Sequence, residues 1–93
     1  MRSIKALRSY KKDFRREARS ENVEAMATEL PVVVAALAAD APLPPKYCDH
    51  LLEGEWRDHG ECHIKPDFLL IYLKLGEDQL HLVRLGPHSE LFR

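Results

Sequence analysis

The chain has 93 residues, of which 45% are apolar and 31% charged, and its net charge is −1. This size and balance predict one soluble globular domain, residues 1–93, with a modest core. The apolar run at residues 68–73 is too short to cross a bilayer, and no apolar stretch follows the basic N-terminus as in a secretory signal. The two cysteines form no paired framework. We therefore expect a cytoplasmic protein with free thiols and no membrane partner.

The charge is distributed unevenly along the chain. Residues 1–20 carry eight basic and two acidic side chains, whereas residues 21–60 carry two basic and eight acidic ones. A basic block of this kind can face a polyanion, and it can equally be the solvated face of a helix. The charge pattern alone does not decide between the two.

The first part of the chain predicts a short strand followed by a helix. Residues 3–7 alternate weakly, as in a strand. Ser9 is placed as a helix N-cap, and we expect a helix of about 12–18 residues after it, basic on its outer face. Apolar side chains recur on one face of this helix at Tyr10, Phe14 and Ala18.

A second helix is expected to end near Ala39. Pro31 is tolerated only in a first turn, so this helix is predicted to begin near Thr28. The prolines within residues 40–47 end it and predict an extended linker.

The second half of the chain has the period of β-structure. Residues 54–59 alternate, with Gly60 expected as a turn. From Phe68 the chain is almost continuously apolar, as an interior strand is. Residues 76–79 predict a hairpin turn before a last strand, residues 80–85. The predicted fold class is α+β: a short N-terminal strand, two helices, then an antiparallel β-meander with the helices on one face.

Titratable side chains gather in three stretches beside the predicted strands: residues 48–50, 62–67 and 84–92. Histidines and an aspartate can exchange protons near neutral pH, and an arginine supplies a planar cation for phosphate oxygens. Such a set suits cleavage of RNA by its own 2′-hydroxyl, a reaction that needs no metal and no cofactor.

Other readings of these residues remain open. A zinc site has suitable ligand types, although their spacing matches no common finger: Cys48, His50, Cys62 and His63. A Cys–His nucleophile lacks a recognisable oxyanion hole. Any single histidine, such as His59 or His81, can simply cap the end of a strand.

Three linked motifs resemble the bacterial YafQ toxins, within the RelE-like group of toxins that cleave messenger RNA. They are LPPKYCDHLLEGEW, CHIKPDFLLIY and VRLGPHSELF, in residues 43–56, 62–72 and 83–92. The resemblance implies a RelE-like fold and a type II toxin that cuts messenger in the ribosomal A site and so inhibits translation. It also implies a cognate, DinJ-like antitoxin that covers the basic first helix and the active site. Operator DNA is expected to be bound only through the toxin–antitoxin complex.

By position, the resemblance implies six catalytic residues: His50, His63, Asp67, Arg84, His88 and Phe92. We expect His88 to act as general acid toward the 5′-oxygen, and Asp67 or His50 as general base at the 2′-hydroxyl. Arg84 would stabilise the phosphorane, and His63 would support the acid–base network.

Further residues are expected to contact RNA. Phe92 would hold a base or the nearby backbone, Phe68 would allow stacking, and Lys65 would touch a phosphate. Pro66 fixes the backbone before the aspartate that follows it. The basic first helix adds the remaining RNA-binding candidates: Arg8, Lys11, Lys12 and Arg15.

Two alternatives act without catalysis. ParE-type toxins share the architecture, lack this histidine set and act on a protein target. A relative that has lost its activity could persist as an antitoxin-binding co-repressor. The slightly acidic net charge departs from the clearly basic character expected of toxins that bind ribosomal RNA.

Overall fold

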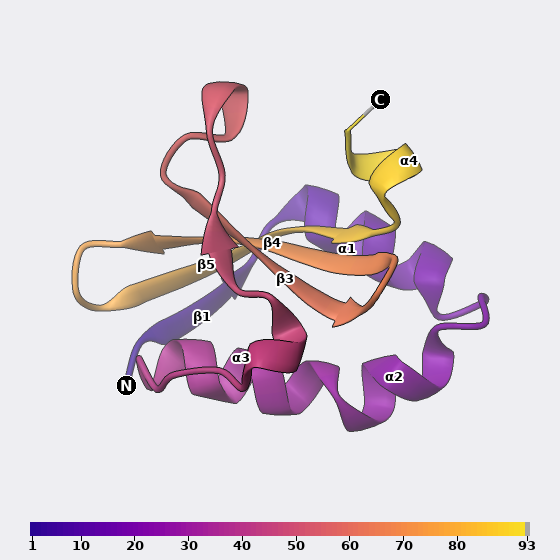
Figure 1. Cartoon of the computed structure of the whole chain (residues 1–93), viewed down its shortest axis with the longest axis horizontal. Coiled ribbons are helices and arrows are strands. Elements are labelled where there is room, and N and C mark those ends of the chain that lie inside the picture. Colours follow the sequence, from indigo (N-terminus) through magenta and orange to yellow (C-terminus); the bar gives the residue numbers. More distant parts are fainter. Residues whose placement is uncertain (93) are drawn as a thin grey trace.

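The computed structural model describes residues 1–92 (Figure 1). Its helices are α1 (Arg8–Glu17), α2 (Val23–Thr28), α3 (Leu30–Ala38) and α4 (His88–Leu91), with single 3-10 turns at Pro45–Tyr47 and Gly54–Trp56. Its strands are β1 (Ser3–Ala6), β2 (His50–Leu51), β3 (His59–Lys65), β4 (Phe68–Leu75) and β5 (Gln79–Gly86). They form one sheet in the order β1-β5-β4-β3-β2, with β1 parallel to β5 and the other pairs antiparallel. The α+β fold class and the meander are confirmed.

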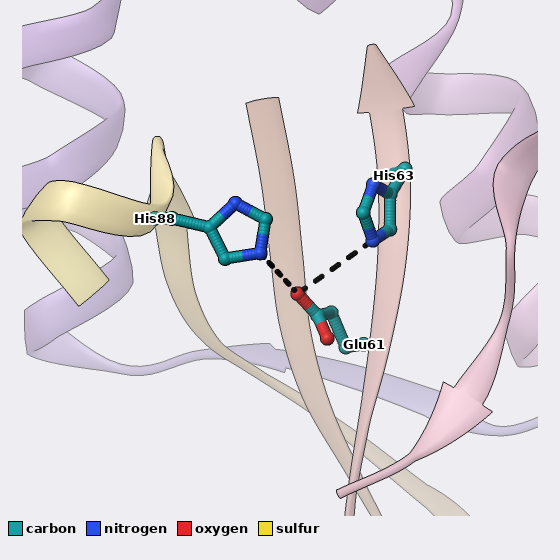
Figure 2. A group of neighbouring side chains, drawn as sticks. All are labelled: Glu61, His63 and His88. Atoms are coloured by element: carbon teal, nitrogen blue, oxygen red, sulfur yellow. Dashed lines mark ion pairs between the residues drawn. The ribbon is translucent and has the colours of Figure 1, made fainter. Parts of the chain in front are cut away.

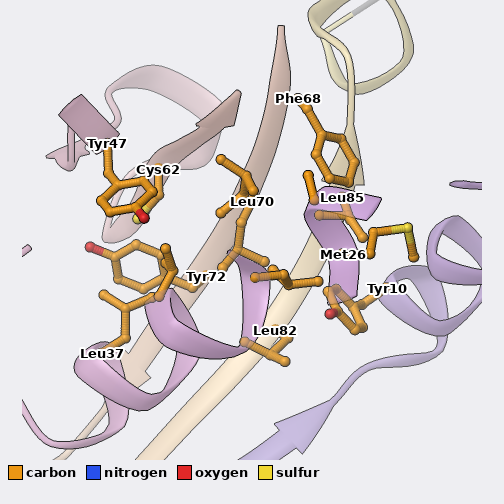
Figure 3. Close-up of a cluster of buried hydrophobic side chains, with 14 of the residues drawn as sticks. Tyr10, Met26, Leu37, Tyr47, Cys62, Phe68, Leu70, Tyr72, Leu82 and Leu85 are labelled. Atoms are coloured by element: carbon orange, nitrogen blue, oxygen red, sulfur yellow. The ribbon is translucent and has the colours of Figure 1, made fainter. Parts of the chain in front are cut away.

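Both faces of the central strands are buried, which explains why β4 is apolar almost throughout. The larger core cluster joins one face of the sheet to α1, α2 and α3 (Figure 3), and includes Tyr10, Met26, Leu37, Leu70 and Leu85. A smaller cluster on the opposite face contains Leu69, Ile71, Val83 and the α4 residue Leu91. The sequence did not predict α4 as a helix on this second face.

The stretch that leads into β4 belongs to a separate strand. Residues 59–65 form β3, which pairs antiparallel with β4, and Pro66 and Asp67 are the turn between them. Cys62 and Ile64 face the larger core, whereas His63 lies directly opposite Leu69 on the other face. His63 and Asp67 therefore lie at the turn end of the β3–β4 hairpin.

A β-bulge at Val83 changes the facing of the last part of β5. Tyr72 pairs with Leu82, but the preceding residue, Ile71, pairs with Arg84, so Val83 is the extra residue. Leu82 lies in the larger core, while Arg84 is directly opposite Ile71 and shares its face. Without the bulge, the two-residue period from Leu82 would point Arg84 into the larger core.

Helix α1 lies along the part of β5 that extends beyond β1, and its side chains satisfy the free strand edge. The Ser9 hydroxyl donates to the Val83 carbonyl at 2.6 Å, and the Leu85 N–H donates to the Asp13 carboxylate at 3.0 Å. The Arg16 guanidinium donates to the Leu85 carbonyl at 2.9 Å. An otherwise unpaired strand edge is thus closed by a helix.

Several expected helix boundaries were wrong. Helix α1 has 10 residues and its N-cap is Leu7, because the Ser9 side chain bonds β5 and not its own helix. Two helices follow where one was expected. Pro31 lies in the first turn of α3 as predicted, but α2 precedes it. Proline has no N–H to continue the hydrogen bonding of α2, so the break falls just before it.

The expected turn at Gly60 was also wrong. Gly60 lies within β3 opposite Tyr72, where an added Cβ would stand 2.2 Å from the tyrosine ring. Glycine is therefore required by close approach and not by a turn. Trp56 belongs to a 3-10 turn and not to an extended strand, and the short β2 was not anticipated. Among residues 1–92, no helix is long and apolar enough to cross a membrane.

Candidate active site

The carboxylate of Glu61 is the centre of a group of three histidines. Figure 2 shows it with two of them, His63 and His88. Glu61 is 4% exposed, and its Oε2 lies 3.0 Å from Nε2 of His50. Its Oε1 lies 3.8 Å from Nε2 of His63 and 3.6 Å from Nε2 of His88. Within residues 1–92, this Oε1 is the one buried side-chain oxygen or nitrogen without a hydrogen-bond partner. Oε1 is therefore a buried acceptor that faces the imidazoles of His63 and His88.

Strand register brings these side chains to one face. Glu61 is directly opposite His50 on β2 and Ile71 on β4, and Ile71 is in turn opposite Arg84 on β5. Directly paired residues project from the same face of a sheet, so residues from four strands share one surface. His88 reaches this surface from the start of α4.

Each histidine has a hydrogen-bond acceptor beside both ring nitrogens. Nδ1 of His50 lies 2.7 Å from the Cys48 carbonyl, and Nδ1 of His63 lies 3.2 Å from the Pro66 carbonyl. Nδ1 of His88 lies 3.1 Å from Oδ1 of Asp67. Each ring therefore has an acceptor beside Nδ1 and the Glu61 carboxylate on the side of Nε2.

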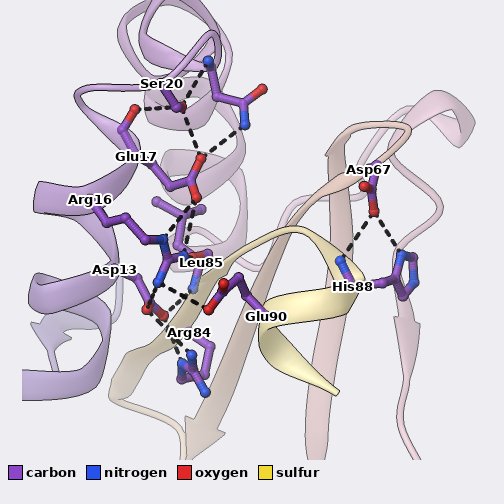
Figure 4. A network of polar contacts seen from close by, with 10 residues as sticks. Asp13, Arg16, Glu17, Ser20, Asp67, Arg84, Leu85, His88 and Glu90 are labelled. Carbon is purple, nitrogen blue, oxygen red and sulfur yellow. Dashed lines mark hydrogen bonds and ion pairs between the residues drawn. The ribbon is translucent and has the colours of Figure 1, made fainter. Parts of the chain in front are cut away.

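Asp67 holds the start of α4 as well as the imidazole of His88 (Figure 4). Its Oδ1 accepts hydrogen bonds from the His88 backbone N–H and from Nδ1 of the same residue, both at 3.1 Å. These two bonds hold the pKa of the Asp67 carboxyl below its usual value. The carboxylate therefore orients His88 through Nδ1 and leaves Nε2 as the nitrogen that can exchange a proton.

Arg84 is not in contact with the histidines but is fixed on the far side of α4 (Figure 4). Its Nε donates to Oδ2 of Asp13 at 2.7 Å, and Asp13 also pairs with Arg16 at 2.8 Å. Burial raises the pKa of the Asp13 carboxyl, but hydrogen bonds from Arg84 and the Leu85 N–H outweigh it, so the pKa lies below its usual value. Arg84 thus stays oriented beside a permanent carboxylate and keeps a quarter of its side chain exposed.

The structure separates the expected RNA contacts into exposed and buried ones. Phe92 is exposed, and its ring centroid lies 5.7 Å from that of His88, so it adjoins the histidine group. Lys65 is half-buried at the end of β3. Phe68 is 1% exposed within the larger core, so the expectation that it stacks on RNA was wrong. The basic candidates on α1 are all exposed: Arg8, Lys11, Lys12 and Arg15.

The loop that carries His50 is tied to the sheet. The Tyr72 hydroxyl donates to Oδ1 of Asp49 at 2.5 Å, and the Cys62 thiol lies 3.6 Å from the same oxygen. Burial raises the pKa of the Cys62 thiol and of the Tyr72 hydroxyl, so both remain protonated donors at neutral pH. This arrangement fixes His50 through the residue before it, and it makes Cys62 a poor nucleophile.

Glu61 is the member of this group that the sequence did not single out. A lone acid in the stretch GECHIK has no distinguishing motif, and only the cross-strand pairing with His50 reveals its place. A metal-compatible group is present among the described residues, but it is Glu61, His63 and His88, whose ligand atoms lie within 4.8 Å of one another. The cysteines considered for zinc, one exposed and one buried, are free thiols and outside this group.

The fold and this site define an α+β toxin of the RelE-like class. The sequence pattern of a family described as "Bacterial toxin of type II toxin-antitoxin system, YafQ" matches residues 2–93. The chain belongs to this YafQ toxin family.

Named relatives share its sequence. The putative toxin YafQ of Haemophilus influenzae is 37% identical over 90 residues, which cover 88% of this chain and 87% of the relative. The mRNA interferase toxin YafQ of Escherichia coli K12 is 45% identical over 51 residues, 55% of this chain. That match spans about half of the relative, 54% of its length.

Solved structures share the fold over nearly the full chain. A copper-bound mutant toxin from Helicobacter pylori superposes with a TM-score of 0.85 at 39% identity, covering 99% of this chain and 100% of the other. A metal-bound toxin from the same organism gives 0.83 at 43% identity, with 99% and 100% covered. The YafQ structure from the Escherichia coli DinJ–YafQ complex gives 0.82 at 30% identity, with 100% of both chains covered.

Proposed function

We propose that this toxin is a ribosome-dependent endoribonuclease that cleaves messenger RNA in the A site by metal-free acid–base transesterification. The observation that carries the proposal is the buried carboxylate of Glu61 within 3.0–3.8 Å of Nε2 on three histidines. Two relatives are named mRNA interferases, which supports RNA as the substrate.

His88 is the general acid in this mechanism. Its Nδ1–H donates to Asp67, so Nε2–H is the proton given to the departing 5′-oxygen. Oε1 of Glu61 lies 3.6 Å from this nitrogen. Asp67 already accepts two bonds from His88, which makes it an orienting group and assigns the base role to His50.

His50 is the general base. When Nδ1–H donates to the Cys48 carbonyl, the Nε2 lone pair can take the proton of the 2′-hydroxyl. Oε2 of Glu61, 3.0 Å away, stabilises the imidazolium that results. His63 is a positioning residue, because its ring lies between the other two, with centroids 6.2 Å from His50 and 5.8 Å from His88.

Arg84 is placed to stabilise negative charge on the phosphorane or on an adjacent phosphate. The bulge at Val83 puts it on the face of Glu61, and Asp13 fixes its guanidinium without burying it fully. Lys65 and the exposed basic residues of α1 would hold phosphates farther along the messenger.

A divalent ion would compete with this chemistry. Two of the similar Helicobacter pylori toxins are described as copper-bound and metal-bound. In this chain the histidine nitrogens and the unpartnered Oε1 of Glu61 are suitable ligands for zinc or copper. A metal held there would occupy the His88 nitrogen that must carry the proton, so we propose that such ions inhibit the enzyme.

The proposed partner is a DinJ-like antitoxin, by analogy with the Escherichia coli DinJ–YafQ toxin–antitoxin complex. Its acidic segment would cover the exposed basic residues of α1, with DNA bound through the antitoxin. In a cytoplasmic setting, the free toxin would then act on translating ribosomes.

The test is cleavage of end-labelled messenger, free and in programmed ribosomes, with the ends identified chemically. We expect ribosome-dependent cuts that leave a 5′-hydroxyl and a cyclic or 3′-phosphate. His88→Ala should abolish cleavage while antitoxin binding persists. No cleavage by folded, antitoxin-free protein in either format would favour a non-catalytic relative with a protein target.

A further inference from the structure

A second hollow adjoins the histidine group, and its chemistry differs from that of the acid–base site. This aromatic groove has a volume of about 520 Å³ and is lined by Glu55, Trp56, His59, Leu91 and Phe92. The 3-10 turn before β3 supplies one wall and α4 the other, and Figure 1 shows both on the same side of the sheet. Binding sites for small ligands commonly have volumes of this order.

The groove is continuous with the catalytic histidines through a row of rings. The centroid of Phe92 lies 5.7 Å from that of His88 and 6.2 Å from that of Trp56. Trp56 in turn lies 5.3 Å from His59. The rings of Phe92 and His59 are tilted 77° and 86° from the indole plane, so they do not stack on it face to face. Trp56 is two ring contacts from the proposed general acid.

The indole of Trp56 is held rigidly but remains partly exposed. It packs against the smaller core cluster of the sheet, which fixes its position, while Phe92 beside it is 39% exposed. A rigid, partly exposed aromatic surface next to a site that cuts RNA is the arrangement on which single-stranded bases stack.

The polar groups of the groove suit a base better than a phosphate. No lysine or arginine is among its lining residues, and the carboxylate of Glu55 would repel a phosphate. A carboxylate instead accepts hydrogen bonds from the amino and imino edges of bases. Nδ1 of His59 is engaged by the Arg57 carbonyl at 3.1 Å, which leaves Nε2 as the nitrogen for a ligand.

We propose that the aromatic groove binds the purine base of a nucleotide adjoining the scissile phosphate, with Trp56 as its stacking surface and Glu55 as the acceptor for its edge. This inference rests on the RNA cleavage proposed above. A two-ring base covers more of the indole than a pyrimidine does, which favours purines. The groove would thereby fix which nucleotide lies at His88 and contribute to the choice of cleavage site.

The groove offers a direct optical test, because Trp56 is the one tryptophan of the sequence. Its fluorescence is measured during titration with a short 2′-O-methyl RNA, which cannot be cleaved because it has no free 2′-hydroxyl. We expect saturable quenching. An RNA of the same length with one base removed should no longer quench Trp56 when the abasic nucleotide is the one next to the nucleotide bound at His88. An abasic nucleotide elsewhere in the RNA should leave the quenching unchanged.

Two substitutions provide a matched comparison. Phe92 and Phe14 are both 39% exposed, but only Phe92 lines the groove. Base stacking contributes about 1–3 kcal/mol, so Phe92→Ala should weaken binding of the purine-containing RNA by roughly 5- to 150-fold. Phe14→Ala should leave binding unchanged, and Glu55→Gln should change the ranking of bases at the groove.

The outcomes separate this proposal from the catalytic one. Quenching that persists in His88→Ala, with no cleavage by the unsubstituted toxin, would support the groove and overturn the ribonuclease assignment. If RNA binds, as shown by anisotropy of labelled RNA, without quenching Trp56 and equally well with Phe92→Ala, the groove proposal is wrong. Quenching by antitoxin but by no RNA would also overturn it and assign the groove to a protein ligand.

Discussion

Replacing Glu61 by glutamine tests whether its negative charge supports the proposed general acid, His88, and the proposed general base, His50. The change keeps the size of the side chain and removes the carboxylate that faces His50, His63 and His88. Two unit charges about 4 Å apart near a protein surface interact by about 4 kcal/mol. Because His50 and His88 are about half exposed, we reduce this to about 1–2 kcal/mol for each imidazolium. Each 1.4 kcal/mol corresponds to tenfold in rate, so the loss at one imidazolium should slow cleavage by roughly 5- to 30-fold.

Folding stability should respond in a different way. A buried carboxylate with one oxygen that accepts no hydrogen bond carries a desolvation cost, which glutamine relieves. The free energy of unfolding in urea should therefore fall by less than about 1 kcal/mol in the variant, or rise. Glu77→Gln, an exposed substitution in the β4–β5 turn, is the matched control for loss of one acid. The rate is measured on programmed ribosomes. A Glu61→Gln toxin that cleaves within twofold of the unsubstituted protein would refute the role given to this charge.

Three further predictions concern the supports of the site. Asp13→Asn should lower the free energy of unfolding by about 2–4 kcal/mol, since it leaves Arg84 without its partner. The pKa of Asp13 is lowered in the folded state, so its carboxylate stabilises the fold at neutral pH and this stabilisation is lost on acidification. The difference in unfolding free energy between Asp13→Asn and the unsubstituted protein, measured in urea, should therefore shrink below about pH 4. A difference that does not change with pH would contradict this account. Gly60→Ala should lower the melting temperature, because the added methyl group clashes with the ring of Tyr72, and adding Tyr72→Leu should restore part of the loss. Equal melting temperatures of the single and the double variant would exclude the clash. Zinc or copper should inhibit cleavage and a chelator should restore it, whereas a chelator that abolishes the activity of metal-free protein would disprove the metal-free mechanism.

The sequence predicts the β-meander well because local signals determine it. The apolar run from Phe68 and the turn at residues 76–79 are each encoded by neighbouring residues. The burial of Phe68 could not be read in the same way. A strand covered on both faces has no polar face, so its period does not tell which side chains remain accessible.

Other features depend on contacts between distant segments. Glu61 acquires its place only through pairing with His50 across two strands. Ser9 is a strong N-cap residue by type, yet the free edge of β5 recruits its hydroxyl. Arg84 was expected from its motif, but its partner Asp13 is 71 residues away, and no local pattern connects them.

The bulge at Val83 has a consequence for how inactive relatives could arise. A change that straightened β5 without altering its length would leave every histidine, Asp67 and Arg84 in the chain, but the regular alternation from Leu82 would then point Arg84 toward the helices. Leu85 would project toward the site. Loss of Val83 itself would not have this effect, because Arg84 would then follow Leu82 directly and keep its face. In comparing members of this family, the geometry of β5 between its core leucine and this arginine is therefore as informative as the identity of the residues.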